Sequence, residues 1–152
     1  RAQGAAPAAA AKLFASAGDV SALIERAKQE RKSDQANFAQ PVVRLPPYTV
    51  NLEYRVSGLN APASVHEKDA EMFFVVEGAG TLVTGGTLRD ERRTNPANLQ
   101  GVGIDGGNSR RIGKGDVIVV PAKTPHWHWP RSGGWSKRRT YPCRSSRSVS
   151  NR

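Results

Sequence analysis

The alternation of apolar and polar residues between positions 48 and 57 constrains the fold of this chain more than any other feature. The apolar members are Tyr48, Val50, Leu52, Tyr54 and Val56, each followed by a polar residue, and the pattern stops at Gly58. A period of two places the two sets of side chains on opposite faces of a β-strand. The segment is therefore predicted to be a strand with one buried face.

Further strands are predicted from short apolar segments that are bounded by Gly, Pro or Asn. These segments are 42–45, 64–66, 70–77, 80–84, 117–121 and 126–129. Short strands at such spacing are typical of antiparallel sandwiches and barrels. Residues 85–115 are rich in Gly, Arg, Asn and Asp and alternate little. We expect them to form a long, partly irregular connection at one mouth of the barrel.

The N-terminal part is predicted to hold an arm and one helix. Residues 1–18 are rich in Ala, Pro and Gly, which favours a flexible arm. From Asp19, the expected N-cap, apolar residues recur at helical spacing until the helix ends near Ser33. The predicted organisation is a flexible arm (1–18), a helix and linker (19–40), a β-barrel (41–130) and a tail (131–152).

The tail carries most of the excess positive charge. The chain has 23 Lys and Arg against 13 Asp and Glu, and seven of the basic residues lie in 131–152, which contains no acid. The remaining residues carry a charge of only +3, which argues against a nucleic-acid-binding face on the folded part. The tail lacks strand periodicity where a closing strand is expected. It is interpreted as sequence that follows a shift of the coding frame near residue 130, with a basic disordered tail as the alternative.

Length, cysteine content and the N-terminal composition limit the class of protein further. A chain of 152 residues is enough for one domain, and its single thiol, Cys143, excludes an intramolecular disulfide. No uninterrupted apolar run is long enough to predict a transmembrane helix. The opening AQGAAPAAAAK resembles the end left after an export signal is removed. A periplasmic or secreted location is predicted, with a cytoplasmic one as the alternative.

Two segments combine histidine with strand-forming residues: SVHEKDAEMFFVVEG at 64–78 and GDVIVVPAKTPHWHWP at 115–130. A histidine near a carboxylate on one strand, facing a histidine on another, supplies the nitrogen and oxygen ligands of a metal site. The alternative is a pair of buried histidines, His66 and His126, in a metal-free barrel. The run MFFVV is apolar on both faces, which predicts that a helix or the second subunit of a homodimer covers its outer side.

These two segments resemble the two motifs of the cupin superfamily. The first motif matches at Gly58, His66, Glu71 and Gly78, with Ser64 in place of the family's first histidine. The second matches at Gly115, Pro121 and His126, whereas Lys123 and Pro130 stand where the family has glycine and asparagine. The resemblance covers about residues 48–130. It implies an all-β fold, an antiparallel double-stranded β-helix or jelly-roll barrel, here with an N-terminal α-helix.

The resemblance also implies a metal site and a class of function. Its metal ligands are His66, Glu71 and His126, which suit a divalent ion such as Mn, Fe, Ni or Zn. Because a neutral serine at position 64 is a poor ligand, the metal is expected to be held weakly or to be absent. The implied function is a metal-dependent enzyme of oxygenase, isomerase or lyase type that acts on a small organic substrate.

The residue two positions after the second histidine is a further candidate. Strand alternation places His128 on the same face as His126, and we assign it as the catalytic proton carrier. The alternative function for the whole chain is a metal-free binding or sensor module, which recognises a small molecule without turning it over.

Overall fold

The computed structural model describes residues 12–59 and 61–131, which form one helix and twelve strands with antiparallel pairing throughout. Contacts divide the chain into two compact units, Arg1–Arg55 and Val56–Arg152. The prediction of a mostly β chain with antiparallel strands and an N-terminal helix is confirmed. Much of the predicted arm (1–11) and nearly all of the predicted tail (132–152) lie outside the described residues.

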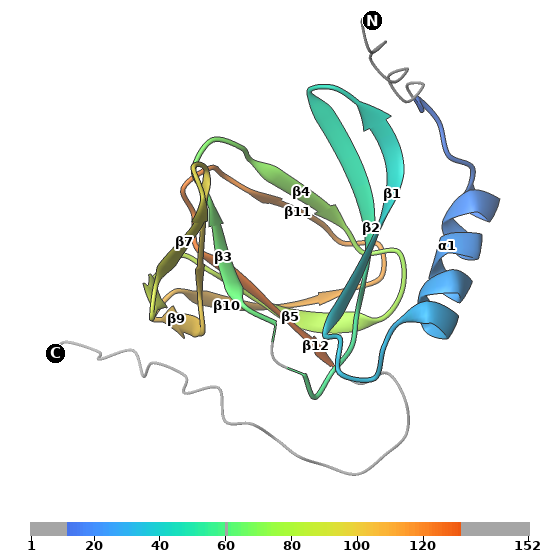
Figure 1. Cartoon of the computed structure of the whole chain (residues 1–152). Helices are drawn as coiled ribbons and strands as arrows, with labels where there is room; N and C mark the ends of the chain where they lie inside the picture. The colour runs from blue at the N-terminus through green and yellow to red at the C-terminus, as the bar shows by residue number, and fades with distance from the viewer. Residues whose placement is uncertain (1–11, 60, 132–152) are drawn as a thin grey trace, which may run out of the picture. The chain divides into compact units, whose positions relative to one another are not determined.

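The first unit begins with helix α1 (Ala17–Glu30), which lies beside a β-hairpin (Figure 1). Ser16, not Asp19, is the N-cap. The Ser16 hydroxyl accepts the backbone N–H of Asp19 at 3.1 Å, and the Asp19 carboxylate accepts the backbone N–H of Ser16 at 2.8 Å. The predicted cap was wrong because both residue types are favoured as N-caps, and here they form a reciprocal capping box. Gln40 of the hairpin donates to the carbonyl of Leu23 at 2.8 Å and so ties it to the helix.

The hairpin consists of β1 (Asn37–Leu45) and β2 (Tyr48–Arg55). The strand predicted from the alternating segment is therefore present. Only part of its apolar face is buried: Leu52 is 8% exposed, whereas Tyr48 and Val50 near the turn are 70% and 50% exposed. A two-stranded hairpin has two open faces, so its apolar side chains are buried only where another element covers them.

The second unit contains the remaining strands, arranged in one large and two small antiparallel sheets. The large sheet has the order β10-β5-β12-β3-β8-β7, and the small sheets pair β11 with β4 and β6 with β9. The strands are β3 (Ala63–His66), β4 (Glu71–Phe74), β5 (Ala79–Thr84), β6 (Thr87–Arg89), β7 (Arg92–Asn95), β8 (Asn98–Gly101), β9 (Gly103–Asp105), β10 (Asn108–Gly113), β11 (Val117–Val120) and β12 (His126–Arg131).

The long irregular connection predicted for residues 85–115 is wrong, because this stretch forms the five strands β6 to β10. These strands are three to six residues long, and β7 and most of β10 are exposed. Strands that expose both faces carry no apolar alternation, so their sequence does not show the period of two. The predicted strand 70–77 is likewise shorter than expected and spans only β4.

The hydrophobic core of the second unit lies on one face of the large sheet. Its buried members are Ala63, Val65, Val83, Leu88 and Trp127, with Leu99 and Ile104 packed against them. The indole N–H of Trp127 donates to the carbonyl of Ala61 at 2.8 Å, which satisfies its polar atom inside the core. Because strands alternate, the neighbours of Trp127 on β12, His126 and His128, point to the opposite face of the sheet.

The β4–β11 pair lies across from strands β5 and β12 (Figure 1). The ring of Phe73 on β4 packs edge-on against the ring of His128 on β12, with centroids 4.5 Å apart, so the two layers are in contact. Among the described residues, the strand ladders form separate sheets and do not close into one barrel. No helix in the described part of the chain is both long and apolar enough to cross a membrane.

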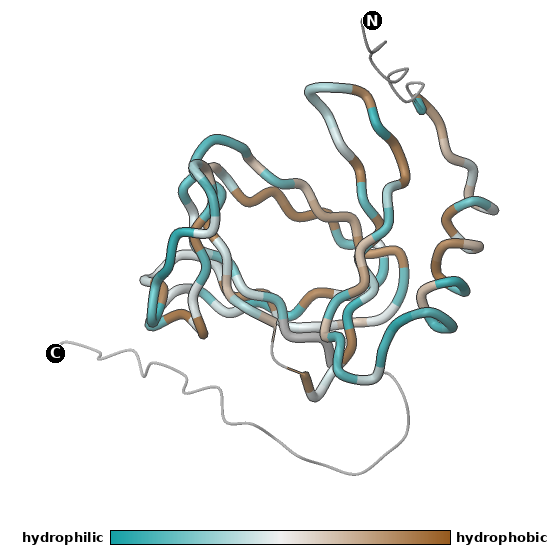
Figure 2. Tube along the Cα trace, viewed as in Figure 1, coloured by the Kyte–Doolittle hydropathy of each residue, from teal (hydrophilic) through white to brown (hydrophobic). Residues whose placement is uncertain are grey.

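The outer side of the β4–β11 pair is apolar and exposed. Strand β11 is apolar along its whole length (Figure 2), and its residues pair with those of β4. The exposed fractions are 72% for Met72, 60% for Phe74, and 62% for both Val117 and Val119. In the described part of the chain these side chains are therefore largely exposed, and burial of this face by a second copy stays a prediction.

Candidate metal centre

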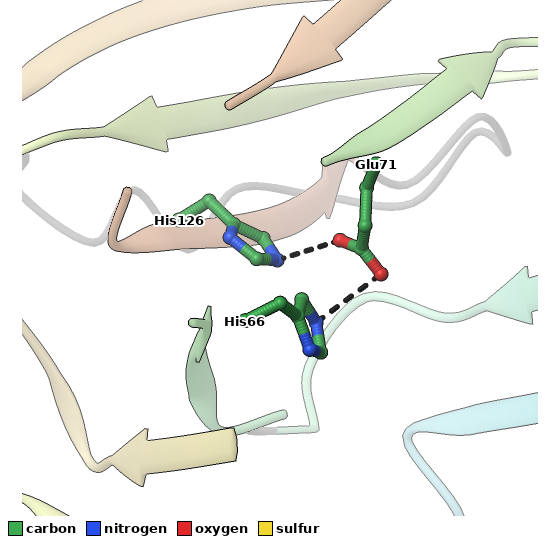
Figure 3. A group of neighbouring side chains, drawn as sticks. All are labelled: His66, Glu71 and His126. Atoms are coloured by element: carbon green, nitrogen blue, oxygen red, sulfur yellow. Dashed lines mark ion pairs between the residues drawn. The ribbon is translucent and has the colours of Figure 1, made fainter. Parts of the chain in front are cut away.

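Three predicted ligands come together on the face of the large sheet opposite the hydrophobic core (Figure 3). His66 ends β3, Glu71 begins β4, and His126 begins β12. Ser64 and His126 are register partners in neighbouring strands, so they share a face, and His66 lies on the same face two residues further along β3. Strand pairing thus brings together residues that are 60 positions apart in the sequence.

The ligand atoms of the three side chains lie within 4.8 Å of one another. His66 Nε2 is 3.2 Å from Glu71 Oε1, and His126 Nε2 is 3.0 Å from Glu71 Oε2. Two ligands bound to one ion at about 2.1 Å lie about 3.0 Å apart at right angles and about 3.4 Å apart in a tetrahedron. The two nitrogen–oxygen distances fit this range, and the three residues can hold a metal ion. Within residues 12–59 and 61–131, no other group of three such side chains converges.

The second nitrogen of each imidazole is held by an acceptor. His126 Nδ1 lies 3.1 Å from the backbone carbonyl of Thr124, and His66 Nδ1 lies 2.8 Å from the side-chain Oδ1 of Asn98. An oxygen acceptor requires the proton to be on Nδ1, so in the neutral ring the lone pair is on Nε2. Both Nε2 lone pairs then face the carboxylate of Glu71, as metal-ligating histidines supported by an outer acceptor do.

Three lone-pair donors that face one another repel unless something positive lies between them. Glu71 Oε2 is buried and has no hydrogen-bond donor in the structure, although His126 Nε2 is close. A buried carboxylate oxygen without a donor is costly. Either a metal ion or a proton on an imidazole removes the repulsion. The donor set therefore fits a divalent cation on chemical grounds.

The electrostatic surroundings keep Glu71 ionised, which is the form in which a carboxylate binds a metal ion. Burial raises the pKa of Glu71 and is the largest single effect, but the polar contact with His126 and the positive charge that the three neighbouring histidines carry when protonated outweigh it. Together they hold the pKa of Glu71 below its usual value. The side chain is therefore an ionised carboxylate at neutral pH, which is the ligand form.

The protein backbone fixes the loops on which the ligands lie. The backbone N–H of Lys123 donates to the carbonyl of His66 at 2.7 Å, and the N–H of Glu67 donates to the carbonyl of Ala97 at 2.8 Å. His126 is only 5% exposed, whereas His66 and Glu71 are half-buried. The centre is thus closed on the side of His126 and open on the side of the other two ligands.

His128 and Ser64 lie beside the three ligands but do not belong to the converging group. The ring of His128 is 5.8 Å from the ring of His126, centroid to centroid, and it packs edge-on against Phe73. The expected position of His128 on the same strand face as His126 is confirmed, because both pair with β5 in an uninterrupted register. Its role as a proton carrier stays a prediction.

Sequence analysis did not find the residues that orient the ligands. Asn98 lies in the stretch that was predicted to be irregular, and its contact with His66 follows from the register of β3 with β8. No spacing in the sequence signals this contact, since the two residues are 32 positions apart. Thr124 contributes only its backbone carbonyl, which any residue could supply.

No protein-family model, curated protein or solved structure matches this chain. The assignment of a function therefore depends on the residues of the chain itself.

Proposed function

We propose that this chain is a cupin-like metalloenzyme in which His66, Glu71 and His126 hold a divalent ion and leave positions open for a small organic substrate. The observation that carries the proposal is the convergence of two Nε2 atoms and one carboxylate, with each Nδ1 held by an acceptor. Two histidines and one carboxylate with open positions are typical of iron oxygenases, and the same donors suit Mn, Ni or Zn.

The backbone at the motif glycines supports the cupin resemblance. The φ angles are 83° at Gly58, 81° at Gly78 and 91° at Gly115. Lys123 stands where the family has a further glycine, and its φ of 64° also lies in the left-handed region. Glycine is the residue that adopts these angles without strain, so all four positions have the conformation that explains the motif.

In this proposal the bound ion and the residues around it have separate chemical roles. When bound, a divalent ion supplies Lewis-acid polarisation of a substrate oxygen, or the activation of dioxygen or water. The ring of Phe73 lies beside the ring of His126, with centroids 6.1 Å apart, and places an apolar group next to this buried ligand. His128 is the proton carrier, because it lies two residues after His126 on β12 and its ring is on the same face of the sheet. Oxygenase, isomerase and lyase reactions are all compatible with this arrangement.

The test is a pair of glutamate variants with the same chemical change. Glu71→Gln removes the ligand charge, whereas Glu67→Gln alters a half-buried carboxylate four residues away that pairs with Arg93 at 2.6 Å. Wild type and both variants are dialysed anaerobically against Mn, Fe, Ni or Zn, and the metal bound to the protein, in excess of the free metal outside, is measured by elemental analysis. Wild type and Glu67→Gln are expected to retain one metal ion per chain, and Glu71→Gln much less. Equal metal content in all three proteins contradicts the proposal.

A thermal-shift screen distinguishes the metalloenzyme from a metal-free binding module. A ligand that binds only the folded state raises the melting temperature. Stabilisation of the wild type by divalent metals, and its loss in Glu71→Gln, is expected. Stabilisation by sugars or organic acids alone, with no effect of any metal, would support the binding module instead.

A further inference from the structure

A cavity of about 540 Å³ lies in the second unit, against strands β5, β10 and β11. Its polar lining includes Thr84, Asn108 and Arg110, and its apolar lining includes Leu82 and Ile118. These residues belong to β5, β10 and β11, none of which supplies a metal ligand. The volume is within the range of small-molecule sites. Polar groups make up most of the lining surface, which suits a polar or charged molecule.

The register of the large sheet connects this cavity to the centre. His126 pairs with Thr84, and Thr84 pairs with Asn108. Residues directly opposite one another in antiparallel strands carry their side chains on the same face. One row of side chains therefore leads from a metal ligand on β12 into the cavity on β10.

A second row of side chains runs beside the first across the same strands and ends at the cationic side chain of Arg110. His128 pairs with Leu82, and Leu82 pairs with Arg110. Neighbouring strands are about 4.8 Å apart, so the Cα of Arg110 lies about 10 Å from that of His128. Arg110 therefore lies two strands away from His128, on the face of the sheet that also carries the metal ligand His126.

Arg110 is the charged group of the cavity lining, and it forms no ion pair with any described residue. By contrast, Arg93 pairs with Glu67, and Arg89 lies 3.4 Å from Asp105. A planar guanidinium group without a protein carboxylate can bind an anion through two parallel hydrogen bonds. One cation matches one carboxylate, whereas a phosphate dianion calls for more positive charge than this cavity provides.

We propose that the substrate is a small organic acid, whose carboxylate pairs with Arg110 while its other end approaches the centre formed by His66, Glu71 and His126. Thr84 and Asn108 provide hydrogen bonds to hydroxyl or carbonyl groups between these two ends. The inference rests on the proposed function for its metal centre, but the anion site itself is made by β5 and β10. The proposed anion site and the proposed metal centre can therefore be disproved independently of each other.

The test compares two adjacent arginines on β10. Arg110 lines the cavity, whereas Arg111 is the next residue along the strand, pairs with Thr81 and points to the other face of the sheet. The variants Arg110→Gln and Arg111→Gln make the same change in charge. Binding of malate, pyruvate and citrate to the full chain is measured by calorimetry at low salt, with the neutral diamide of malate and inorganic phosphate as comparison probes.

At least one of the three acids is expected to bind wild type and Arg111→Gln alike, and to bind Arg110→Gln at least about tenfold more weakly. The diamide is expected to bind poorly to all three proteins. Binding of none of the acids, equal binding to both variants, or tighter binding of phosphate than of any acid would each overturn the inference. The metal content of Arg110→Gln is measured in parallel and should equal that of wild type. If Arg110→Gln loses acid binding but retains metal, the loss comes from Arg110 and not from damage to the metal centre. If wild type takes up no metal, the proposed function fails, whatever the result for acid binding.

Discussion

Replacement of Asn98 by alanine should weaken metal binding without removing a ligand. Asn98 Oδ1 accepts the Nδ1 proton of His66 at 2.8 Å, and so fixes the ring tautomer that presents Nε2 to Glu71. Loss of such an outer partner typically lowers metal affinity 10- to 100-fold. This range corresponds to about 1.4 to 2.8 kcal/mol of binding free energy. The lost hydrogen bond should also lower the free energy of unfolding by about 1 kcal/mol.

Asn95→Ala is the matched control for this experiment. Asn95 lies in the same turn, and its Oδ1 accepts the backbone N–H of Ala97 at 2.9 Å, without contact with a histidine. The two alanine variants should lose similar stability, but only Asn98→Ala should lose metal affinity. Asn98→Asp keeps an acceptor for the Nδ1 proton and should retain near wild-type affinity.

The assay is a competition between the protein and a chromophoric chelator for Zn, with urea denaturation of the metal-free variants to measure stability. An affinity of Asn98→Ala within a factor of two or three of wild type would refute the reasoning from the tautomer. An equal loss in Asn95→Ala would refute it as well, because the effect would then come from the turn and not from the imidazole.

Three further predictions address the neighbouring site, the helix cap and the exposed sheet face. Ser64 is the register partner of His126, so Ser64→His places a third imidazole beside the centre. This variant should raise metal affinity at least about tenfold, measured by the same chelator competition. An unchanged affinity would argue against a ligand position at residue 64. The hydrogen bonds from the backbone and side chain of Ser16 hold the pKa of Asp19 below its usual value, so the capping box stabilises the folded protein fully above that usual value, and this stability is lost as pH falls through the lowered pKa. Titration of Asp19 by NMR should give a lower pKa in the folded protein than in an unstructured peptide of the same segment, and equal values would contradict the cap. Phe74, 60% exposed on the apolar face of β4, should support the predicted homodimer, so light scattering should report a dimer for wild type and a monomer for Phe74→Lys; a monomeric wild type would rule the dimer out.

Local patterns predicted those parts of the chain whose burial follows a simple period. The alternation of residues 48–56 predicted β2, and the spacing of apolar residues after Asp19 predicted most of α1. The strands β6 to β10 were missed for two reasons. Strand β7 and most of β10 are exposed and show no alternation, whereas β6, β8 and β9 are three or four residues long and carry one large apolar residue each, too few to show a period of two. Their pairing is decided by hydrogen bonds to neighbouring strands, which the local sequence does not encode.

By itself, the sequence determined which residues could act as ligands, since imidazole and carboxylate chemistry depends on residue type. The resemblance to the cupin motifs selected His66, Glu71 and His126 among such residues, and the structure brings these three together. Only the tertiary structure decided that Asn98 orients His66, and that Arg110 faces a cavity on the same sheet face. The physical reason is that a contact between strands depends on register, and a shift of one residue would turn each of these side chains to the other face.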